Sequence, residues 1–183
     1  MDKQNVEVLG EITAKFYDQT TLYKWQKLFN KFISAFRKQW PRMMRMYQLG
    51  ELIMVDKHTN VICDAGFNAV CRRLANDITY SGIINYMLLG TGAGSAAATD
   101  TQLITEAYRN AVASGTASGR IAFLMAYFTE TEIDGTFTEF GNVIDGEAGA
   151  DTGLIWSHLA GLNWVKTNTM ALVVDCQYSF ASV

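Results

Sequence analysis

The chain has 183 residues, with 15 Lys and Arg, 18 Asp and Glu, and a formal net charge of −3 at pH 7. About half of the residues are hydrophobic, a composition that excludes an intrinsically disordered chain and suits one ordinary domain with an appendage. No apolar stretch is long enough to span a bilayer, so we expect a soluble chain. The three cysteines, Cys63, Cys71 and Cys176, lack metal-site spacing, and we expect mostly buried, reduced thiols.

The first predicted element is an amphipathic helix from Asp18 to Trp40. Residues three or four positions apart share one face of a helix. The apolar stripe on this face consists of Leu22, Trp25, Phe29, Phe32 and Phe36. Pro41 disfavours the helical conformation at Trp40 and ends the helix there. A stripe of about two and a half heptads is too short to form a stable helix alone, so it needs a partner surface.

Charge divides the chain into two unlike parts. Residues 1–79 carry a net charge of +4, whereas residues 80–183 carry −7. A basic helix of this kind can lie in a membrane interface, bind nucleic acid, or pack its stripe against protein. We favour packing against protein, either this chain's own β-domain or another chain. The predicted organisation is therefore a helical anchor segment over 1–50 and a β-sandwich domain over 51–183.

Short strands and one more helix follow the anchor. The run ELIMV at 51–55 predicts a strand, KHTN at 57–60 a turn, and 66–76 a short helix with Asp64 at its N-cap. An apolar run predicts a strand over 83–89. Asp134-Gly135 is a hairpin signal, which makes 120–144 a predicted hairpin. Two more strands, over 154–166 and 169–180, complete a mainly β fold of the sandwich or jelly-roll-like type.

Motifs that would indicate chemistry are incomplete in this chain. The loop Gly90-Thr91-Gly92-Ala93-Gly94-Ser95 lacks the third glycine and the following helix of a dinucleotide-binding loop. His58 and His158 have no cysteine or carboxylate at ligand spacing, so we interpret both as surface or interface residues. No serine lies in a nucleophile elbow. We therefore predict no catalytic, cofactor-binding or metal-binding residues and no enzymatic activity.

Glu106 and Arg109 are the charged pair of most interest. They lie three positions apart, and on a helical turn they would be neighbours. Such a pair on a surface contributes only a few tenths of a kcal/mol. A buried pair would be a tighter structural contact, because its hydrogen bonds are charge-assisted.

From Asn60 to Lys166 the chain resembles a domain of tailed-bacteriophage virion proteins, which are tail-fibre, collar, baseplate or head-decoration components. The resemblance rests on spaced motifs: a glycine-bearing helix start, a Gly-Thr-Gly turn after a strand, an Asp-Thr followed by a Glu and an Arg, a Glu-x-Gly, and a late lysine. Here these are Ala65-Gly66, Tyr86, Gly90, Gly92, Asp100-Thr101, Leu103, Glu106, Arg109, Glu139, Gly141 and Lys166. Ala96 to Ala98 replace the proline that usually follows the turn.

The resemblance implies a non-catalytic structural subunit of a virion, in the tail, neck or baseplate, with other virion proteins as partners. It also implies a homo-oligomer, as a trimer, ring or fibre. We expect no cofactor and no specific nucleic-acid or membrane partner. One alternative is a capsid decoration or head-fibre protein. Another is a carbohydrate-binding receptor module, with Trp156, Trp164 and Tyr178 as stacking faces.

Overall fold

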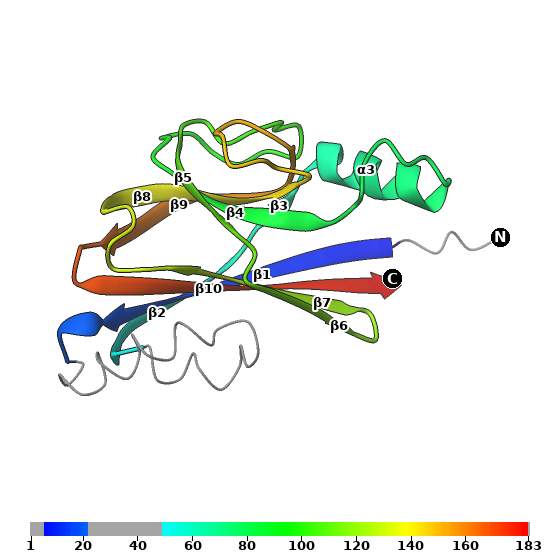
Figure 1. Ribbon diagram of the computed structural model, residues 1–183. Helices are drawn as coiled ribbons and strands as arrows, with labels where there is room; N and C mark the ends of the chain where they lie inside the picture. The colour runs from blue at the N-terminus through cyan, green and yellow to red at the C-terminus, as the bar shows by residue number, and fades with distance from the viewer. Residues whose placement is uncertain (1–5, 22–48, 183) are drawn as a thin grey trace.

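The computed structural model describes residues 6–21 and 49–182, which form two five-stranded antiparallel sheets and one α-helix. Sheet A has the order β2-β1-β10-β7-β6, and sheet B has the order β3-β9-β8-β4-β5. Figure 1 shows the two sheets as stacked layers, with the helix beside one end of sheet B. This arrangement is consistent with the predicted mainly β sandwich.

The strands of sheet A are β1 (Val6–Asp18), β2 (Glu51–Thr59), β6 (Ser114–Ser118), β7 (Ile121–Phe128) and β10 (Met170–Ser182). Those of sheet B are β3 (Val61–Ile62), β4 (Ile84–Gly90), β5 (Glu106–Ala111), β8 (Gly135–Ile144) and β9 (Leu154–Lys166). A 3-10 turn, η1 (Gln19–Thr21), follows β1, and the helix is α3 (Asp64–Leu74).

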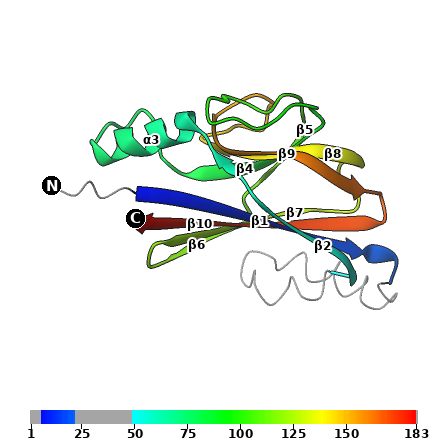
Figure 2. The ribbon, with the colours of Figure 1, turned by 180° about the vertical axis from the view of Figure 1, so that it is seen from behind.

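The two ends of the chain form the middle of sheet A. β1 pairs with β10 without a break, from Val6 opposite Ser182 to Asp18 opposite Met170. The views in Figures 1 and 2 both place the start of β1 beside the end of β10. Because β1 also pairs with β2 from Glu11 to Asp18, this part of its backbone has a strand partner on both sides.

The main core lies between the sheets. Alternate residues of a strand point to opposite faces, so β1 contributes Ile12, Ala14 and Phe16 to this core. The fully buried Trp164 of β9 packs against Phe16 and Phe140, with ring centroids 6.2 and 5.7 Å apart. Contacts of this kind join sheet A to sheet B.

Several predicted elements are confirmed. Strands occupy the predicted runs at 83–89, 154–166 and 169–180, within one or two residues at their ends, and the run at 51–55 is the first part of a longer strand. The short helix is present as α3, but Cys63 occupies the N-cap position and Asp64 is the first helical residue. Cys63 and Cys176 are buried and Cys71 is exposed, all as free thiols.

The N-terminal prediction needs correction. The stretch assigned to a helical anchor contains β1, a central strand of sheet A. The predicted helix lies outside the described residues except at its start, where Asp18 ends β1 and Gln19–Thr21 form η1. The signal for β1 was present in VEVLGEITAKFYD, which alternates small or apolar with polar residues.

Two predicted turns are also wrong. Lys57, His58 and Thr59 belong to β2, because this strand continues along β1 beyond the apolar run. Residues 120–144 do not form a hairpin, since β7 pairs with β10 and β6, whereas β8 pairs with β4 and β9. The segment around Asp134-Gly135 instead crosses from sheet A to sheet B.

The pairing of β1 predicts the effect of truncation. A chain that starts at Gly50 loses β1 and leaves β2 and β10 without their shared neighbour, so it should be unfolded or insoluble. Circular dichroism and thermal melting of the soluble fraction measure this. A chain that starts at Asn5 keeps β1 and serves as the control, with an unchanged melting temperature. A folded, soluble chain from Gly50 would contradict the central position of β1.

Candidate functional site on the outer face of sheet B

The predicted motif residues that belong to strands lie in two neighbouring rows on the outer face of sheet B, and Gly92 lies in the loop after β4. Strand register places Glu139, Gly90 and Glu106 in one row across β8, β4 and β5. The next row contains His158, Gly141, Leu88 and Arg109. Residues far apart in the sequence are therefore brought together by cross-strand pairing alone.

Glu139 is the centre of the first cluster, and its side chain is fully buried. Its Oε1 accepts hydrogen bonds from the backbone N–H groups of Gly92 and Thr105, at 2.7 and 2.8 Å. Its Oε2 accepts one from the N–H of Ile104 at 3.0 Å and contacts the Nε2 atom of His158 at 3.0 Å. Three backbone N–H donors and the ring of His158 thus surround one buried carboxylate, and the three donors fix both ends of the 91–105 loop.

Glycines leave the space that this carboxylate occupies. A Cβ atom at Gly90 would lie 2.6 Å from the Cγ atom of Glu139, and one at Gly92 would lie 2.4 Å from Oε1. On the adjoining row, a Cβ at Gly141 would lie 2.9 Å from Leu103, the buried apolar residue of the loop. The loop therefore packs directly on the sheet.

His158 lies between two carboxylates and is fully buried. Its Nδ1 contacts Asp100 Oδ2 at 2.6 Å, while Nε2 faces Glu139. The prediction of a surface or interface histidine is wrong, because the carboxylate partners come from a loop and another strand. The sequence alone does not reveal these partners, because they depend on the β8–β9 register that places His158 opposite Gly141.

Asp100 links the loop to this histidine. Its side chain is 25% exposed, and its carboxylate accepts hydrogen bonds from the N–H of Ala97 and from His158. Partial burial raises the pKa of Asp100, but the hydrogen bonds and the charge of His158 outweigh burial and hold this pKa below its usual value. The ionised form is therefore stabilised in the folded state.

Arg109 is the centre of the second cluster. Its guanidinium forms two hydrogen bonds of 2.6 Å with the carboxylate of Glu106, and the two side chains are 5% and 1% exposed. Its Nη1 also donates to the carbonyl of Glu147 and the hydroxyl of Thr152, at 2.8 and 2.7 Å. Of the two possibilities left open by the sequence, the structure shows a buried pair, and both residues lie in a strand and not on a helical turn.

This arginine holds the 145–153 loop against the sheet. The ring of Tyr86 lies 5.6 Å from the guanidinium carbon, and the N–H of Asp151 donates to Glu106. A bidentate guanidinium and carboxylate pair fixes orientation as well as distance. The Arg109–Glu106 pair therefore holds the 145–153 loop on sheet B, as Glu139 holds the 91–105 loop.

Lys166 fixes the segment that crosses between the sheets. Its side chain is fully buried, and its ammonium donates to the carbonyl of Ile133 at 3.0 Å. Burial lowers the pKa of Lys166, although the charges of Asp134 and Glu132 oppose this shift.

A separate polar cluster lies inside the sandwich. Tyr178 Oη contacts Asn142, Ser157 and Asn60, and burial raises its pKa well above the usual value. Burial likewise raises the pKa of the Cys63 thiol to about 12, so this thiol is protonated at neutral pH and a poor nucleophile.

In these clusters the buried charged side chains are satisfied by hydrogen bonds and ion pairs with one another and with the loop backbone. His158 directs one nitrogen to each carboxylate, so the three side chains do not converge on a common ion. Within residues 6–21 and 49–182, no group of three or more His, Cys, Asp or Glu side chains is placed to hold a metal ion. The glycine-rich loop after Gly90 leads from β4 to β5 and not into a helix, so it lacks the structural context of a dinucleotide-binding loop.

The remaining predicted residues are placed differently. Trp156, Trp164 and Tyr178 are buried, at 3%, 0% and 1% exposure, so they cannot present stacking faces to a carbohydrate. The five residues of the predicted partner-binding stripe, Leu22, Trp25, Phe29, Phe32 and Phe36, lie outside the described residues.

Comparison of the chain with protein-family models, with curated proteins and with solved structures finds no match. In the part of the chain that the structure describes, no helix is both long and apolar enough to cross a membrane.

The buried pair predicts a large cost for Arg109→Ala. This change leaves the carboxylate of Glu106 buried without its partner, so the free energy of unfolding should fall by about 3 to 5 kcal/mol. Urea unfolding followed by fluorescence measures the change. Arg120→Ala is the matched control, because Arg120 is exposed, and it should change stability by less than about 0.5 kcal/mol. Equal effects of both changes would contradict the bracing role.

The depressed pKa of Asp100 predicts a pH dependence. A carboxyl group whose folded-state pKa is lowered contributes stability above its unfolded pKa of about 3.9 and loses it as pH falls through the lower folded value. Asp100→Asn should therefore be less stable than the unaltered chain at pH 6, with a difference that shrinks toward pH 2. Melting temperatures across this range provide the test. Glu7→Gln, at an exposed position of β1, should show no such trend, and a constant deficit for Asp100→Asn would refute the linkage.

Proposed function

We propose that this chain is a non-catalytic structural subunit of a tailed-bacteriophage virion, located in the tail, neck or baseplate, that assembles with copies of itself. The main observation behind the proposal is that the motif residues are buried and hold loops in place. Gly90, Gly92, Glu106, Arg109, Glu139 and Gly141 have buried side chains or backbones and brace the loops over sheet B. Polar residues used in this way favour mechanical rigidity over chemistry.

An exposed edge strand supports self-assembly. β2 lies at the edge of sheet A, and four consecutive apolar residues are well exposed on it: Leu52 at 48%, Ile53 at 46%, Met54 at 39% and Val55 at 46%. Because neighbouring residues point to opposite faces, both faces of β2 are open there. Exposed apolar edge strands pair readily with other chains.

The occupant that we propose for this edge is another copy of the chain. A trimer or ring requires a contact between two different surfaces, and β2 supplies one of them. The predicted helix between η1 and β2 would serve attachment to a second virion protein. A capsid decoration or head-fibre protein remains the second candidate, because it needs the same kind of exposed β-module.

Native mass spectrometry tests the assembly. The unaltered chain should have a mass that is a multiple of 20.3 kDa, and Ile53→Lys combined with Val55→Lys should reduce it to one chain. Both residues are exposed, so the charges should disrupt association without disturbing the core. Val165→Lys is the control, because Val165 is also 46% exposed but lies on β9. A single-chain mass for the unaltered protein would refute self-assembly.

A further inference from the structure

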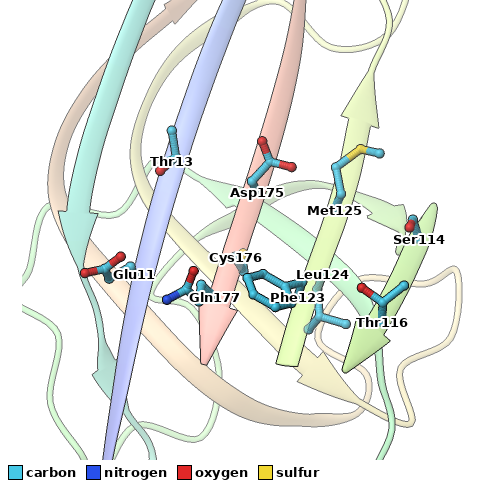
Figure 3. Close-up of a pocket in the computed structure, with 10 residues that line it drawn as sticks. All are labelled: Glu11, Thr13, Ser114, Thr116, Phe123, Leu124, Met125, Asp175, Cys176 and Gln177. Atoms are coloured by element: carbon cyan, nitrogen blue, oxygen red, sulfur yellow. The ribbon is translucent and has the colours of Figure 1, made fainter. Parts of the chain in front are cut away.

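The outer face of sheet A carries a groove of about 310 Å³, within the size range of small-molecule sites. It spans β1, β10, β7 and β6, and it lies on the face away from the braced loops of sheet B. Figure 3 shows the side chains of these strands gathered around it. None of the motif residues of sheet B lines the groove.

Strand register arranges the lining in two adjacent rows. One row runs through Thr13, Asp175, Met125 and Ser114, and the other through Glu11, Gln177, Phe123 and Thr116. Residues of one row lie on the same face because they are direct cross-strand partners. The groove is therefore built from the central strands of the sheet and not from loops.

Phe123 is the aromatic member of this lining. It is 38% exposed, and Figure 3 shows its ring between β10 and β7, beside Gln177. An aromatic face carries partial negative charge and attracts the polarised C–H groups of a sugar ring. An exposed phenylalanine on a sheet face otherwise has an unfavourable contact with water.

Hydrogen-bonding groups surround this ring. Gln177 is the direct cross-strand neighbour of the ring on β10, Glu11 lies one strand farther away on β1, and the hydroxyl of Thr116 lies on the other side. A carboxylate accepts hydrogen bonds from sugar hydroxyls, whereas an amide both donates and accepts. Glu11 forms no ion pair with the residues that the structure describes, so its carboxylate is available to a ligand.

Charge narrows the class of ligand. The carboxylate of Asp175 is paired with Lys15 at 2.8 Å, and among the residues that the structure describes no Lys or Arg lines the groove itself. The carboxylate of Glu11, which no described cation pairs, would repel phosphate, sulfate and acidic sugars. One of the two carboxylates is already paired, and the polar lining is otherwise neutral: Thr13, Ser114, Thr116 and Gln177. This combination favours an uncharged ligand over a polycation.

We infer that this groove binds a neutral saccharide, with Phe123 stacking on the sugar ring and Glu11 and Gln177 binding its hydroxyls. This inference goes beyond the proposed structural function, and it places carbohydrate recognition on sheet A, away from the buried Trp156 and Trp164. A structural subunit with such a groove would carry a glycan contact on its exposed face.

Titration calorimetry of the full chain tests the site. The probes are the methyl glycosides of glucose, galactose, mannose and N-acetylglucosamine, together with neutral oligosaccharides of these sugars. At least one should bind, and Phe123→Ala should weaken its affinity by about tenfold or more. Glu11→Gln should also weaken binding of the same ligand, and this variant tests the site if Phe123→Ala does not fold. Melting curves verify folding.

Matched variants and a cationic probe complete the design. Phe67→Ala replaces an aromatic residue of 37% exposure on α3, and Glu7→Gln replaces an exposed carboxylate on the same strand as Glu11, so both should leave affinity unchanged. Absence of binding by every neutral saccharide at millimolar concentration overturns the inference. Binding that is unaffected by Phe123→Ala and Glu11→Gln also overturns it, as does binding of spermidine in place of saccharides.

Discussion

The outer face of sheet B depends on one buried carboxylate. Removing the charge of Glu139 from water costs several kcal/mol, and this cost is offset only where donors surround both oxygens. Three backbone N–H groups and His158 meet this requirement, and the three N–H groups all belong to the loop that follows β4. The loop can leave the sheet only by leaving the carboxylate unsatisfied. A connection of 15 residues without helix or strand, from 91 to 105, thereby acquires a defined position.

The same principle divides the molecule into a closed face and an open one. Arg109 and Lys166 are buried cations that bind backbone carbonyls of loops, as Glu139 binds backbone N–H groups. Sheet B is consequently covered by its own connections. On sheet A, by contrast, a groove and the apolar residues of edge strand β2 remain accessible. The proposed self-assembly and recognition accordingly use sheet A, whereas the loops over sheet B are held by buried charged groups.

Local pattern predicted most of the strands and one helix, because hydrophobic periodicity reports burial within a segment. It could not predict which strands pair. Asp134-Gly135 has the chemistry of a hairpin turn, yet its flanking strands lie in different sheets, a choice made by the whole core. The pairing of Glu106 with Arg109 was predicted, whereas the partners of His158 depend on β8–β9 register and on a loop. Burial of Trp164 and Tyr178 likewise depends on the packing of the two sheets, so their rings are not available on the surface to stack on a carbohydrate.

A β-module with braced loops and an exposed edge suits a repeated structural subunit, and the proposed virion role combines this geometry with the resemblance that we infer from the sequence motifs. Cryo-electron microscopy of intact particles tests that role most directly. The account predicts density for this two-sheet domain in multiple symmetry-related copies at the tail, neck or baseplate, with β2 in contact with a neighbouring copy. Particles in which no density fits the domain, or in which β2 faces solvent in every copy, would contradict it.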